Sequence, residues 1–210
     1  MAKRAVDIVL SVLSLLVLAP LFLVLAAWIK LDSPGPVFFR AVRIGRQRRP
    51  FKPYKFRTMV VDAQQRSRVV STPKDDPRIT RAGSVIRRFN LDELPQFINV
   101  LKGEMSIVGP RPEVPEYVAL FTEEQEAILS VRPGITDWAT LWIRDKGEIL
   151  AGNQEPEKVY VERIRPEKLR LQLDYVRGHS VWVDFEIMAR TFKVHLLDRF
   201  KAPRRTKFDG

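Results

Sequence analysis

The longest hydrophobic stretch of the chain covers residues 8–29 and reads IVLSVLSLLVLAPLFLVLAAWI. A straight helix of this length would span the roughly 30 Å hydrocarbon core of a bilayer. Pro20 lies near its middle, where proline removes a helix hydrogen bond and predicts a kink or break. Each arm would then cross about half a bilayer. The pattern predicts a membrane helix that either spans the bilayer or enters and leaves it by one face.

Basic residues flank this stretch on both sides. Lys3 and Arg4 precede it, and the basic residues that follow are Lys30, Arg40, Arg43, Arg46, Arg48 and Arg49. Because basic flanks are retained in the cytoplasm, this arrangement favours a hairpin whose two ends share the cytoplasmic side. A secretory signal peptide would also begin with basic residues, but no small-x-small cleavage site follows the apolar run.

Beyond Asp32 the hydrophobic pattern consists of short segments. PVFFRAVRIG and FKPYKFRTM predict two short strands around a turn over residues 45–50, and MSIVG predicts a further strand. STPKDDPRIT predicts a loop. A short helix is expected over residues 84–88, and the C-terminal third is expected to be helical, with helix starts at Pro156 and Pro166. These patterns therefore predict that residues 32–210 form a mostly helical α+β domain.

Two capping boxes predict further helix starts. Thr122 and Gln125 form one of them. Asn90 and Glu93 form the other, ahead of an apolar helix face that comprises Leu94, Phe97, Ile98 and Leu101. Gly103 lies where this helix should end. Asp92 would then lie in the first helical turn, where the macrodipole favours negative charge and would keep this carboxylate ionised.

A hydrophobic stripe also repeats at helical spacing near the C-terminus. It comprises Trp182, Phe185, Met188, Ala189, Phe192 and Leu196, and the opposing basic residues are Arg190, Lys193 and Arg199. We expect the stripe to face the domain core. Contact with a membrane surface is the alternative.

Charge and composition narrow the classes of function. With 36 Lys+Arg against 25 Asp+Glu, the formal net charge is +11, which predicts attraction to nucleic acid, anionic lipid or phosphorylated substrates. The absence of cysteine excludes disulfides, thiolate metal sites and a cysteine nucleophile. The two histidines, His179 and His195, are too few to suggest a histidine-based metal site.

Five basic side chains could gather at the Asp92-Glu93 pair: Lys55, Arg57, Arg87, Arg111 and Arg144. Lys55 and Arg57 are two residues apart on a predicted strand and would point to one side, and Pro110 and Pro112 restrict Arg111. Each basic residue alone could be a solvated surface charge. Together they could hold a diphosphate, and the carboxylates could supply a nucleophile and a Mg²⁺ ligand. No Walker-type or G-x-G-x-x-G loop is present, which argues against P-loop and Rossmann enzymes.

These segments resemble the bacterial sugar transferases, which are monotopic phosphoglycosyl transferases that load a sugar phosphate onto polyprenyl phosphate. The resemblance runs in order through KRAVDIVLS, SPGPVFFR, KFRTM, DPRIT, LDELPQFINVLKGEMSIVGPRP and RPGIT, over about residues 3–144. It implies a re-entrant membrane helix over residues 1–31, broken at Pro20, and a cytosolic catalytic domain over residues 32–210. That domain would lie on the cytoplasmic face of the bacterial inner membrane and carry interfacial amphipathic helices.

The resemblance also implies roles for individual residues. Asp92 would be the nucleophile and Glu93 would be associated with Mg²⁺, while the active-site cations would be Lys55, Arg87, Arg111 and Arg144. The implied reaction transfers a sugar-1-phosphate from a UDP-sugar to undecaprenyl phosphate through a covalent Asp92 intermediate, releases UMP and begins glycoconjugate biosynthesis. The implied partners are the UDP-sugar, polyprenyl phosphate and membrane lipid, without nucleic acid.

One stretch departs from the family pattern. The usual GITGWAQ is GITDWAT here, with Asp137 in place of glycine and Thr140 in place of glutamine. Glycine allows backbone angles that aspartate adopts less readily, so neither the loop conformation nor the sugar recognised can be carried over from typical family members. Two alternative functions remain at this point: a glycosyltransferase in which the carboxylates only hold metal and UDP leaves, and a non-catalytic membrane-tethered module that binds anionic lipid or nucleic acid.

Overall fold

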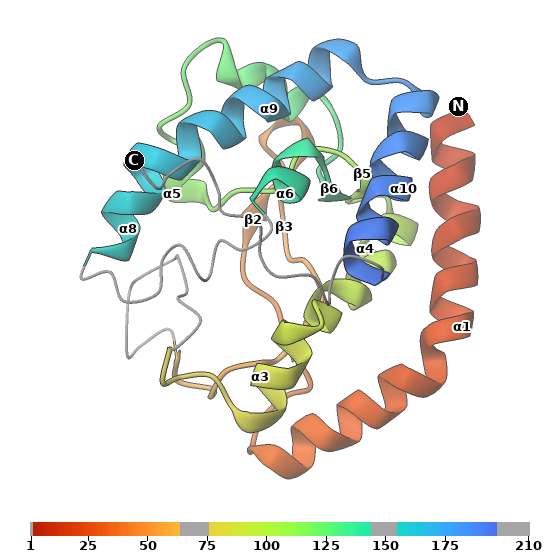
Figure 1. Ribbon diagram of the computed structural model, residues 1–210. Helices are drawn as coiled ribbons and strands as arrows, with labels where there is room; N and C mark the ends of the chain where they lie inside the picture. The colour runs from red at the N-terminus through yellow and green to blue at the C-terminus, as the bar shows by residue number, and fades with distance from the viewer. Residues whose placement is uncertain (1, 64–75, 144–154, 197–210) are drawn as a thin grey trace.

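The computed structural model describes residues 2–63, 76–143 and 155–196. These residues form a mostly helical α+β fold with one long apolar helix, α1 (Ala2–Asp32), along one side (Figure 1). The strands in this part of the chain are two or three residues long and form three two-stranded sheets. The predicted fold class is confirmed at this level.

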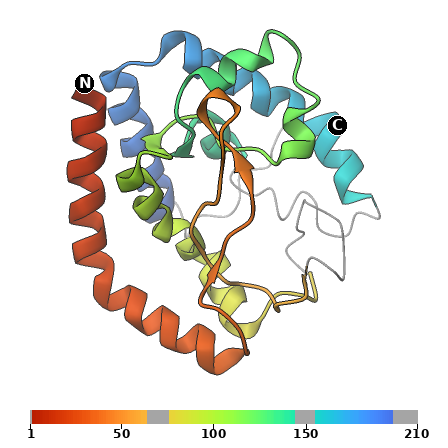
Figure 2. The ribbon, with the colours of Figure 1, turned by 180° about the vertical axis from the view of Figure 1, so that it is seen from behind.

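Helix α1 continues through Pro20, and the helix is bent into two arms (Figures 1 and 2), as a proline inside a helix is expected to cause. Its first arm runs beside α4 (Phe97–Lys102) and α10 (Val181–Leu196), and its second arm runs toward α3 (Arg81–Arg88). It is long and apolar enough to cross a membrane. The predicted kink is therefore present, without a break in the helix.

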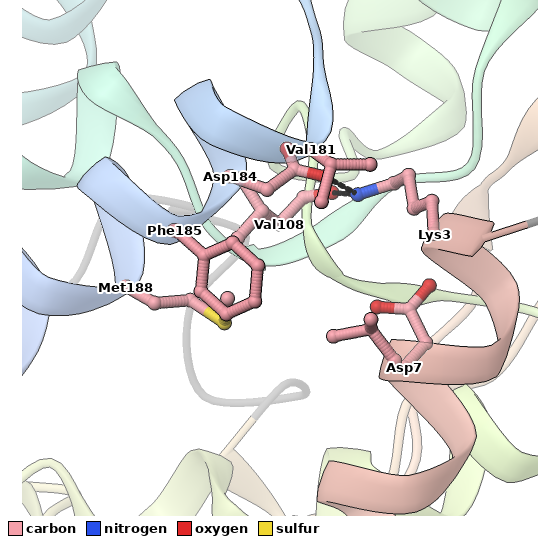
Figure 3. Close-up of a pocket in the computed structure, with 8 residues that line it drawn as sticks. Lys3, Asp7, Val108, Val181, Asp184, Phe185 and Met188 are labelled. Atoms are coloured by element: carbon pink, nitrogen blue, oxygen red, sulfur yellow. Dashed lines mark hydrogen bonds and ion pairs between the residues drawn. The ribbon is translucent and has the colours of Figure 1, made fainter.

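The start of α1 is bonded to the globular part. The buried Asp7 carboxylate accepts a hydrogen bond from the Ser106 hydroxyl (2.9 Å), at the start of β5 (Ser106–Val108). The Lys3 ammonium donates to the Val108 carbonyl oxygen (2.9 Å) and pairs with the Asp184 carboxylate on α10 (2.5 Å), at the edge of a small pocket (Figure 3). These contacts fasten the first arm to β5 and α10.

The end of α1 is also attached to the globular part. The Asp32 carboxylate accepts a hydrogen bond from the Ala82 backbone N–H (3.0 Å), in the first turn of α3. The second arm contributes to a buried apolar cluster of Leu25, Ile29, Phe56, Ala82 and Ile86. Both ends of α1 are thus held by the same domain.

The predicted hairpin is confirmed. The antiparallel pairs are β1 (Phe38–Phe39) with β4 (Lys55–Phe56) and β2 (Arg43–Ile44) with β3 (Pro50–Phe51). A 3₁₀ turn, η1 (Arg46–Arg48), joins β2 to β3. This hairpin carries Lys55 into the interior of the domain.

The parallel sheet is formed by β5 and β6 (Gly134–Thr136), so the predicted MSIVG strand is also confirmed. Gly109 and Gly134 allow these two segments to approach closely, because a Cβ on Gly134 would lie 2.1 Å from the Gly109 nitrogen. Because β5 and β6 are parallel, the segments that follow them, which begin at Gly109 and Asp137, leave the sheet at the same end.

Further helices follow in the described chain. They are η2 (Leu91–Gln96), α5 (Pro115–Val118), η3 (Gln125–Ser130), α6 (Trp138–Trp142), α8 (Pro156–Val159), the π-helix η4 (Tyr160–Ile164) and α9 (Arg165–Gly178). The Thr122–Gln125 box is confirmed by reciprocal hydrogen bonds of 3.1 and 3.3 Å. The helix predicted over residues 84–88 begins earlier, at Arg81. The main core cluster is Val100, Met105, Ile107, Val108, Tyr175 and Ile187.

The hydrophobic stripe of α10 does not face the core, so that prediction is wrong. Trp182 is 82% exposed and Phe192 is 63% exposed, while the buried face of the helix carries Asp184 and Ile187. The reason is the Asp184 carboxylate, which pairs with Lys3 and accepts a hydrogen bond from the Tyr175 hydroxyl (2.7 Å). These polar contacts turn the aromatic stripe outward.

Candidate active site

The carboxylate pair lies on η2, and the local structure there differs from the predicted capping box. Asn90 adopts a left-handed conformation (φ 48°), and its side chain makes no capping hydrogen bond. Glu93 does not cap the helix, because cations from two distant segments hold its side chain. The capping box is therefore wrong, whereas Gly103 ends α4 as predicted, with φ 80°.

Glu93 is held by Arg111 and Lys55. The Arg111 guanidinium binds it in a two-pronged contact, from Nη1 to Oε2 (2.8 Å) and from Nη2 to Oε1, and the Lys55 ammonium donates to Oε1 (2.7 Å). Burial acts to raise the pKa of Glu93, but the charges and hydrogen bonds of Arg111 and Lys55 outweigh it and hold the pKa well below its usual range. Glu93 is thus an ionised carboxylate in a fixed position.

Asp92 is adjacent in sequence but differs in its surroundings. It is partly buried, and no residue in the described part of the chain donates a hydrogen bond to its carboxylate. Burial, followed by the charge of Glu93, raises the pKa of Asp92, while Lys55, Arg87 and Arg111 act to lower it. The short 3₁₀ helix η2 gives Asp92 little of the expected dipole stabilisation, and the neighbouring Glu93 charge acts against its ionisation.

The structure brings together three of the five cations expected at the pair. Lys55 and Arg111 bind Glu93 directly, and Arg87, on the last turn of α3, acts electrostatically on Asp92. Arg144 lies outside the described residues. The result is a carboxylate without a partner in the described chain, surrounded by cations that can attract an anionic substrate.

Arg57 is not brought to the pair. Its side chain donates to the carbonyl oxygens of Ser33 (2.8 Å), Pro34 (2.7 Å) and Pro36 (2.7 Å), just after α1. Arg57 is only 5% exposed. Since the last carbonyls of a helix lack partners within it, a buried guanidinium here satisfies and fixes the end of α1.

Replacing Arg57 with lysine should destabilise the protein without changing substrate affinity. One ammonium cannot reproduce the guanidinium's contacts, so we expect a loss of about 2–4 kcal/mol in the free energy of unfolding. Thermal unfolding in detergent would measure this loss, and Arg88→Lys, at an exposed position of α3, is the control. An unchanged free energy of unfolding in Arg57→Lys would contradict this structural role.

Arg43 is a further cation near the site, and it is not among the site residues predicted from the sequence. Burial lowers the pKa of Arg43, the charge of Arg111 lowers it further, and Glu113 and Glu93 act in the opposite direction. The next residue, Ile44, donates its backbone N–H to the Glu113 carbonyl oxygen (2.9 Å), which joins β2 to the residue after the Pro-Arg-Pro segment (residues 110–112). No sequence spacing relates Arg43 to Arg111, and only this pairing of strand and segment reveals the proximity.

Asp137 departs from the family pattern without distorting the backbone. Its φ of −156° is extended and accessible to any residue, so aspartate is accommodated here without backbone strain. Its side chain accepts a hydrogen bond from the Thr140 backbone N–H (2.6 Å) and begins α6. Asp137 therefore acts as an N-cap here.

The carboxylate pair fits a divalent cation that is held jointly with a substrate. An ionised carboxylate offers about four lone-pair positions, and Glu93 uses three of them on Arg111 and Lys55. Asp92 accepts none from the described residues. Mg²⁺ commonly takes one or two carboxylates together with phosphate oxygens and water. Among the described residues no group of three or more acidic, histidine or cysteine side chains could hold a metal by itself, which is consistent with this arrangement.

The small pocket of Figure 3 lies elsewhere. It is formed where α1, β5 and α10 meet, and its lining residues are Lys3, Val6, Asp7, Val108, Val181, Asp184, Phe185 and Met188. Neither carboxylate of the Asp92-Glu93 pair lines it. We therefore assign the candidate site from the charged side chains and not from this cavity.

Comparison with known proteins places these features in one family. A family profile described as bacterial sugar transferase matches residues 1–198. The undecaprenyl-phosphate glucose phosphotransferase of Komagataeibacter xylinus is 42% identical, over 94% of this chain and 36% of that protein. The UDP-glucose:undecaprenyl-phosphate glucose-1-phosphate transferase of Escherichia coli K12 is 40% identical, over 90% of this chain and 39% of that protein.

Relatives of similar length also occur. The exopolysaccharide production protein PSS of Rhizobium leguminosarum bv. phaseoli is 57% identical, over 90% of this chain and 92% of that protein. This chain thus spans well under half of the two longer relatives and corresponds to nearly the whole of the third. Because the profile covers α1, the carboxylate pair and the Pro-Arg-Pro segment in a single match, the chain belongs to the bacterial sugar transferase family.

Proposed function

We propose that this protein transfers a sugar-1-phosphate from a UDP-sugar to undecaprenyl phosphate through a covalent intermediate on Asp92, and that UMP is released. The names of the K. xylinus and E. coli relatives support the substrate classes. The name of the R. leguminosarum relative supports a place in exopolysaccharide production.

The contrast between the two carboxylates carries the proposal. Arg111 and Lys55 bind Glu93, whereas Asp92 accepts no hydrogen bond from the described residues and lies in the field of Lys55, Arg87 and Arg111. A carboxylate that neutralised cations structurally would be expected to bind them directly. Asp92 is instead available to a substrate, and the cations around it suit a diphosphate.

In the first step an oxygen of Asp92 attacks the phosphorus that bears the sugar. The bond from this phosphorus to the bridging oxygen breaks, and UMP leaves with that oxygen and its electron pair. The free guanidinium edge of Arg111 and the ammonium of Lys55 stabilise charge on the phosphoryl oxygens. The product is an acyl phosphate, in which an anhydride bond joins the Asp92 carboxylate to the sugar phosphate, and no net proton transfer is needed.

In the second step a phosphate oxygen of undecaprenyl phosphate attacks the same phosphorus. The bond to Asp92 breaks, the carboxylate is regenerated, and the diphosphate-linked lipid sugar leaves. Two separate displacements suit a water-soluble donor and a membrane-bound acceptor, because the two substrates need not be bound together.

We also propose that Glu93 would hold Mg²⁺ together with the diphosphate. When bound, the ion would neutralise negative charge on the phosphate oxygens and on the departing nucleotide. Removal of Mg²⁺ with a chelator is accordingly expected to stop UMP release.

Identification of the released nucleotide tests the proposed function. The full chain in nanodiscs would be incubated with undecaprenyl phosphate, Mg²⁺ and a panel of UDP-sugars that includes UDP-glucose and UDP-N-acetylgalactosamine. We expect UMP, and we expect labelling of the protein from UDP-sugar carrying ³²P at the sugar-linked phosphate when the acceptor is omitted. Release of UDP would establish an ordinary glycosyltransferase. Release of no nucleotide across the panel would overturn catalysis in favour of a binding module.

We further propose that α1 is re-entrant, with both ends on the cytoplasmic side of the bacterial inner membrane. The contacts of Lys3 and Asp7 at its start and of Asp32 at its end support this topology, because they join both ends to one domain. A spanning helix would place its ends on opposite sides of the membrane. The exposed apolar residues of α1 between these ends, which include Leu16 and Val17, would contact lipid.

Cysteine labelling of this cysteine-free chain tests the topology. Single cysteines at Ala2 and Ser33 should both react with a membrane-impermeant reagent only when the cytoplasmic face is accessible. A cysteine at the exposed Glu123 of the globular part is the control for that face. Reaction of the Ala2 site from outside intact cells would exclude the hairpin. Pro20→Leu should straighten α1 and expose that site in part of the population.

We propose that the outward stripe of α10 contacts the same membrane. Trp182, Phe185 and Phe192 are exposed on a helix that runs beside the first arm of α1, and amphipathic helices with aromatic residues bind the bilayer interface. In vesicles with brominated acyl chains, the quenched part of the tryptophan fluorescence should therefore fall in Trp182→Phe. Trp142→Phe, in the globular part, is the control. An unchanged quenched component in Trp182→Phe would place α10 away from the bilayer.

A further inference from the structure

The Asp137 carboxylate is fully buried and makes contacts beyond its capping role. Its relative exposure is 0%. Oδ1 accepts the Thr140 backbone N–H (2.6 Å), whereas Oδ2 accepts the Arg111 backbone N–H (3.1 Å) and the Gln172 side-chain amide (3.0 Å). One side chain therefore links the start of α6, the Pro-Arg-Pro segment and α9.

The parallel sheet explains why Asp137 meets Arg111. Both residues follow the carboxyl ends of β5 and β6, and these ends share an edge because the strands are parallel. The Gly109 N–H bonds to the Thr136 carbonyl oxygen (3.0 Å), and the Gly134 N–H bonds to the Pro110 carbonyl oxygen (2.9 Å). The backbones next to Asp137 and Arg111 are thus fixed relative to one another.

Arg111 is held through both of its backbone groups. Its N–H donates to Asp137, and its carbonyl oxygen accepts from the Gln172 amide (3.3 Å), which also binds Asp137. Gln172 is as fully buried as Asp137. With Pro110 and Pro112 on either side, little freedom remains for the backbone from which the Arg111 guanidinium extends to Glu93.

We propose that Asp137, together with Gln172, is a positioning residue that fixes the Arg111 guanidinium against Glu93 and the substrate diphosphate. The inference rests on the proposed function, which assigns Arg111 to the diphosphate. The charge of Asp137 adds to that of Glu93 in raising the pKa of Arg111, which is consistent with their proximity. Family members with glycine at this position lack the carboxylate, so this way of positioning Arg111 is restricted to chains with aspartate there.

A double-mutant cycle distinguishes positioning from stability. Asp137→Asn keeps the side-chain volume, but one acceptor becomes a donor, so it cannot accept from both Thr140 and Arg111. We expect kcat/KM for the UDP-sugar to fall about 10- to 100-fold, which is the effect of displacing a catalytic group by a fraction of an ångström to an ångström. In an Arg111→Lys background, where the two-pronged group is already lost, the further loss should be within about twofold. Any fall in unfolding temperature should be the same in both backgrounds.

Two further variants keep the test decisive. Gln172→Leu removes the other contact to Arg111 with little change in volume, and it should repeat the non-additive loss if Asp137→Asn fails to fold. Thr122→Ala removes an exposed capping side chain that contacts no residue of the candidate site in the described chain, and it should leave kcat/KM unchanged. Equal losses of kcat/KM for Asp137→Asn in both backgrounds would overturn the positioning role. An unchanged kcat/KM in Arg111→Lys alone would instead count against the proposed role of Arg111.

Discussion

Asp92→Asn should abolish turnover while leaving the fold intact. An amide cannot displace UMP from the sugar-linked phosphorus, so loss of the nucleophile should lower kcat by on the order of 10⁴-fold or more. The Asp92 carboxylate accepts no hydrogen bond from the described residues, and an asparagine of almost the same volume should disturb little around it. UMP release and labelling of the protein from sugar-phosphate-labelled UDP-sugar would measure the loss.

The control is a similar change at a surface carboxylate. Asp174, on α9, is half exposed and pairs with Arg170, so Asp174→Asn removes the same charge far from η2. We expect it to retain wild-type turnover and labelling. Purified Asp92→Asn with wild-type labelling would remove Asp92 from the mechanism and leave it as a binding residue only.

Local signals in the sequence predicted those elements whose partners are close in the chain. The kink at Pro20, the end of α4 at Gly103 and the box of Thr122 and Gln125 each depend on a few neighbouring residues. The Asn90–Glu93 box has an equally good local pattern but fails. Glu93 is bound by Lys55 and Arg111, which lie 38 and 18 residues away, and this buried ion pairing outweighs a capping contact.

The orientation of α10 could not be obtained from hydrophobicity alone. The stripe of Trp182, Phe185 and Phe192 has the stronger apolar pattern, and burying it would be the expected outcome in a water-soluble domain. Asp184 is buried instead, because it pairs with Lys3, 181 residues away in the sequence. Lys3 belongs to α1, which is itself apolar. The outward stripe of α10 can therefore lie in the same apolar environment as α1.

The candidate site was predictable in part. Resemblance to the family predicts one common site for Asp92, Glu93, Lys55, Arg87 and Arg111, and the structure places these residues around one another. Arg57 was assigned from strand alternation, but β4 ends at Phe56, so the alternation rule does not extend to Arg57. The carbonyl groups after α1 bind it instead. In the sequence, Asp137 is notable only because it replaces the glycine of the family pattern. Its contact with Arg111 depends on the parallel pairing of β5 and β6, which the sequence does not reveal.

Arg111→Lys should lower kcat/KM by about 10²- to 10³-fold although it keeps the positive charge. The guanidinium presents two parallel donors to Glu93 and further donors to a phosphate, whereas an ammonium is a single point of charge on a flexible stem. Its loss should also release Glu93 from its two-pronged contact and leave Lys55 as its remaining direct partner among the described residues. Steady-state UMP release at saturating undecaprenyl phosphate would measure the effect.

Arg48→Lys is the matched control for Arg111→Lys. Arg48 makes the same kind of two-pronged contact with Glu126, but its side chain is 58% exposed and lies outside the candidate site. An exposed pair contributes little because water screens it, so this variant should keep its unfolding temperature and its kcat/KM. If both lysine variants had the same wild-type kinetics, the Arg111–Glu93 pair would be a structural brace of the Pro-Arg-Pro segment. A selective loss in Arg111→Lys would show that the shape of the cation, and not its charge alone, serves the reaction.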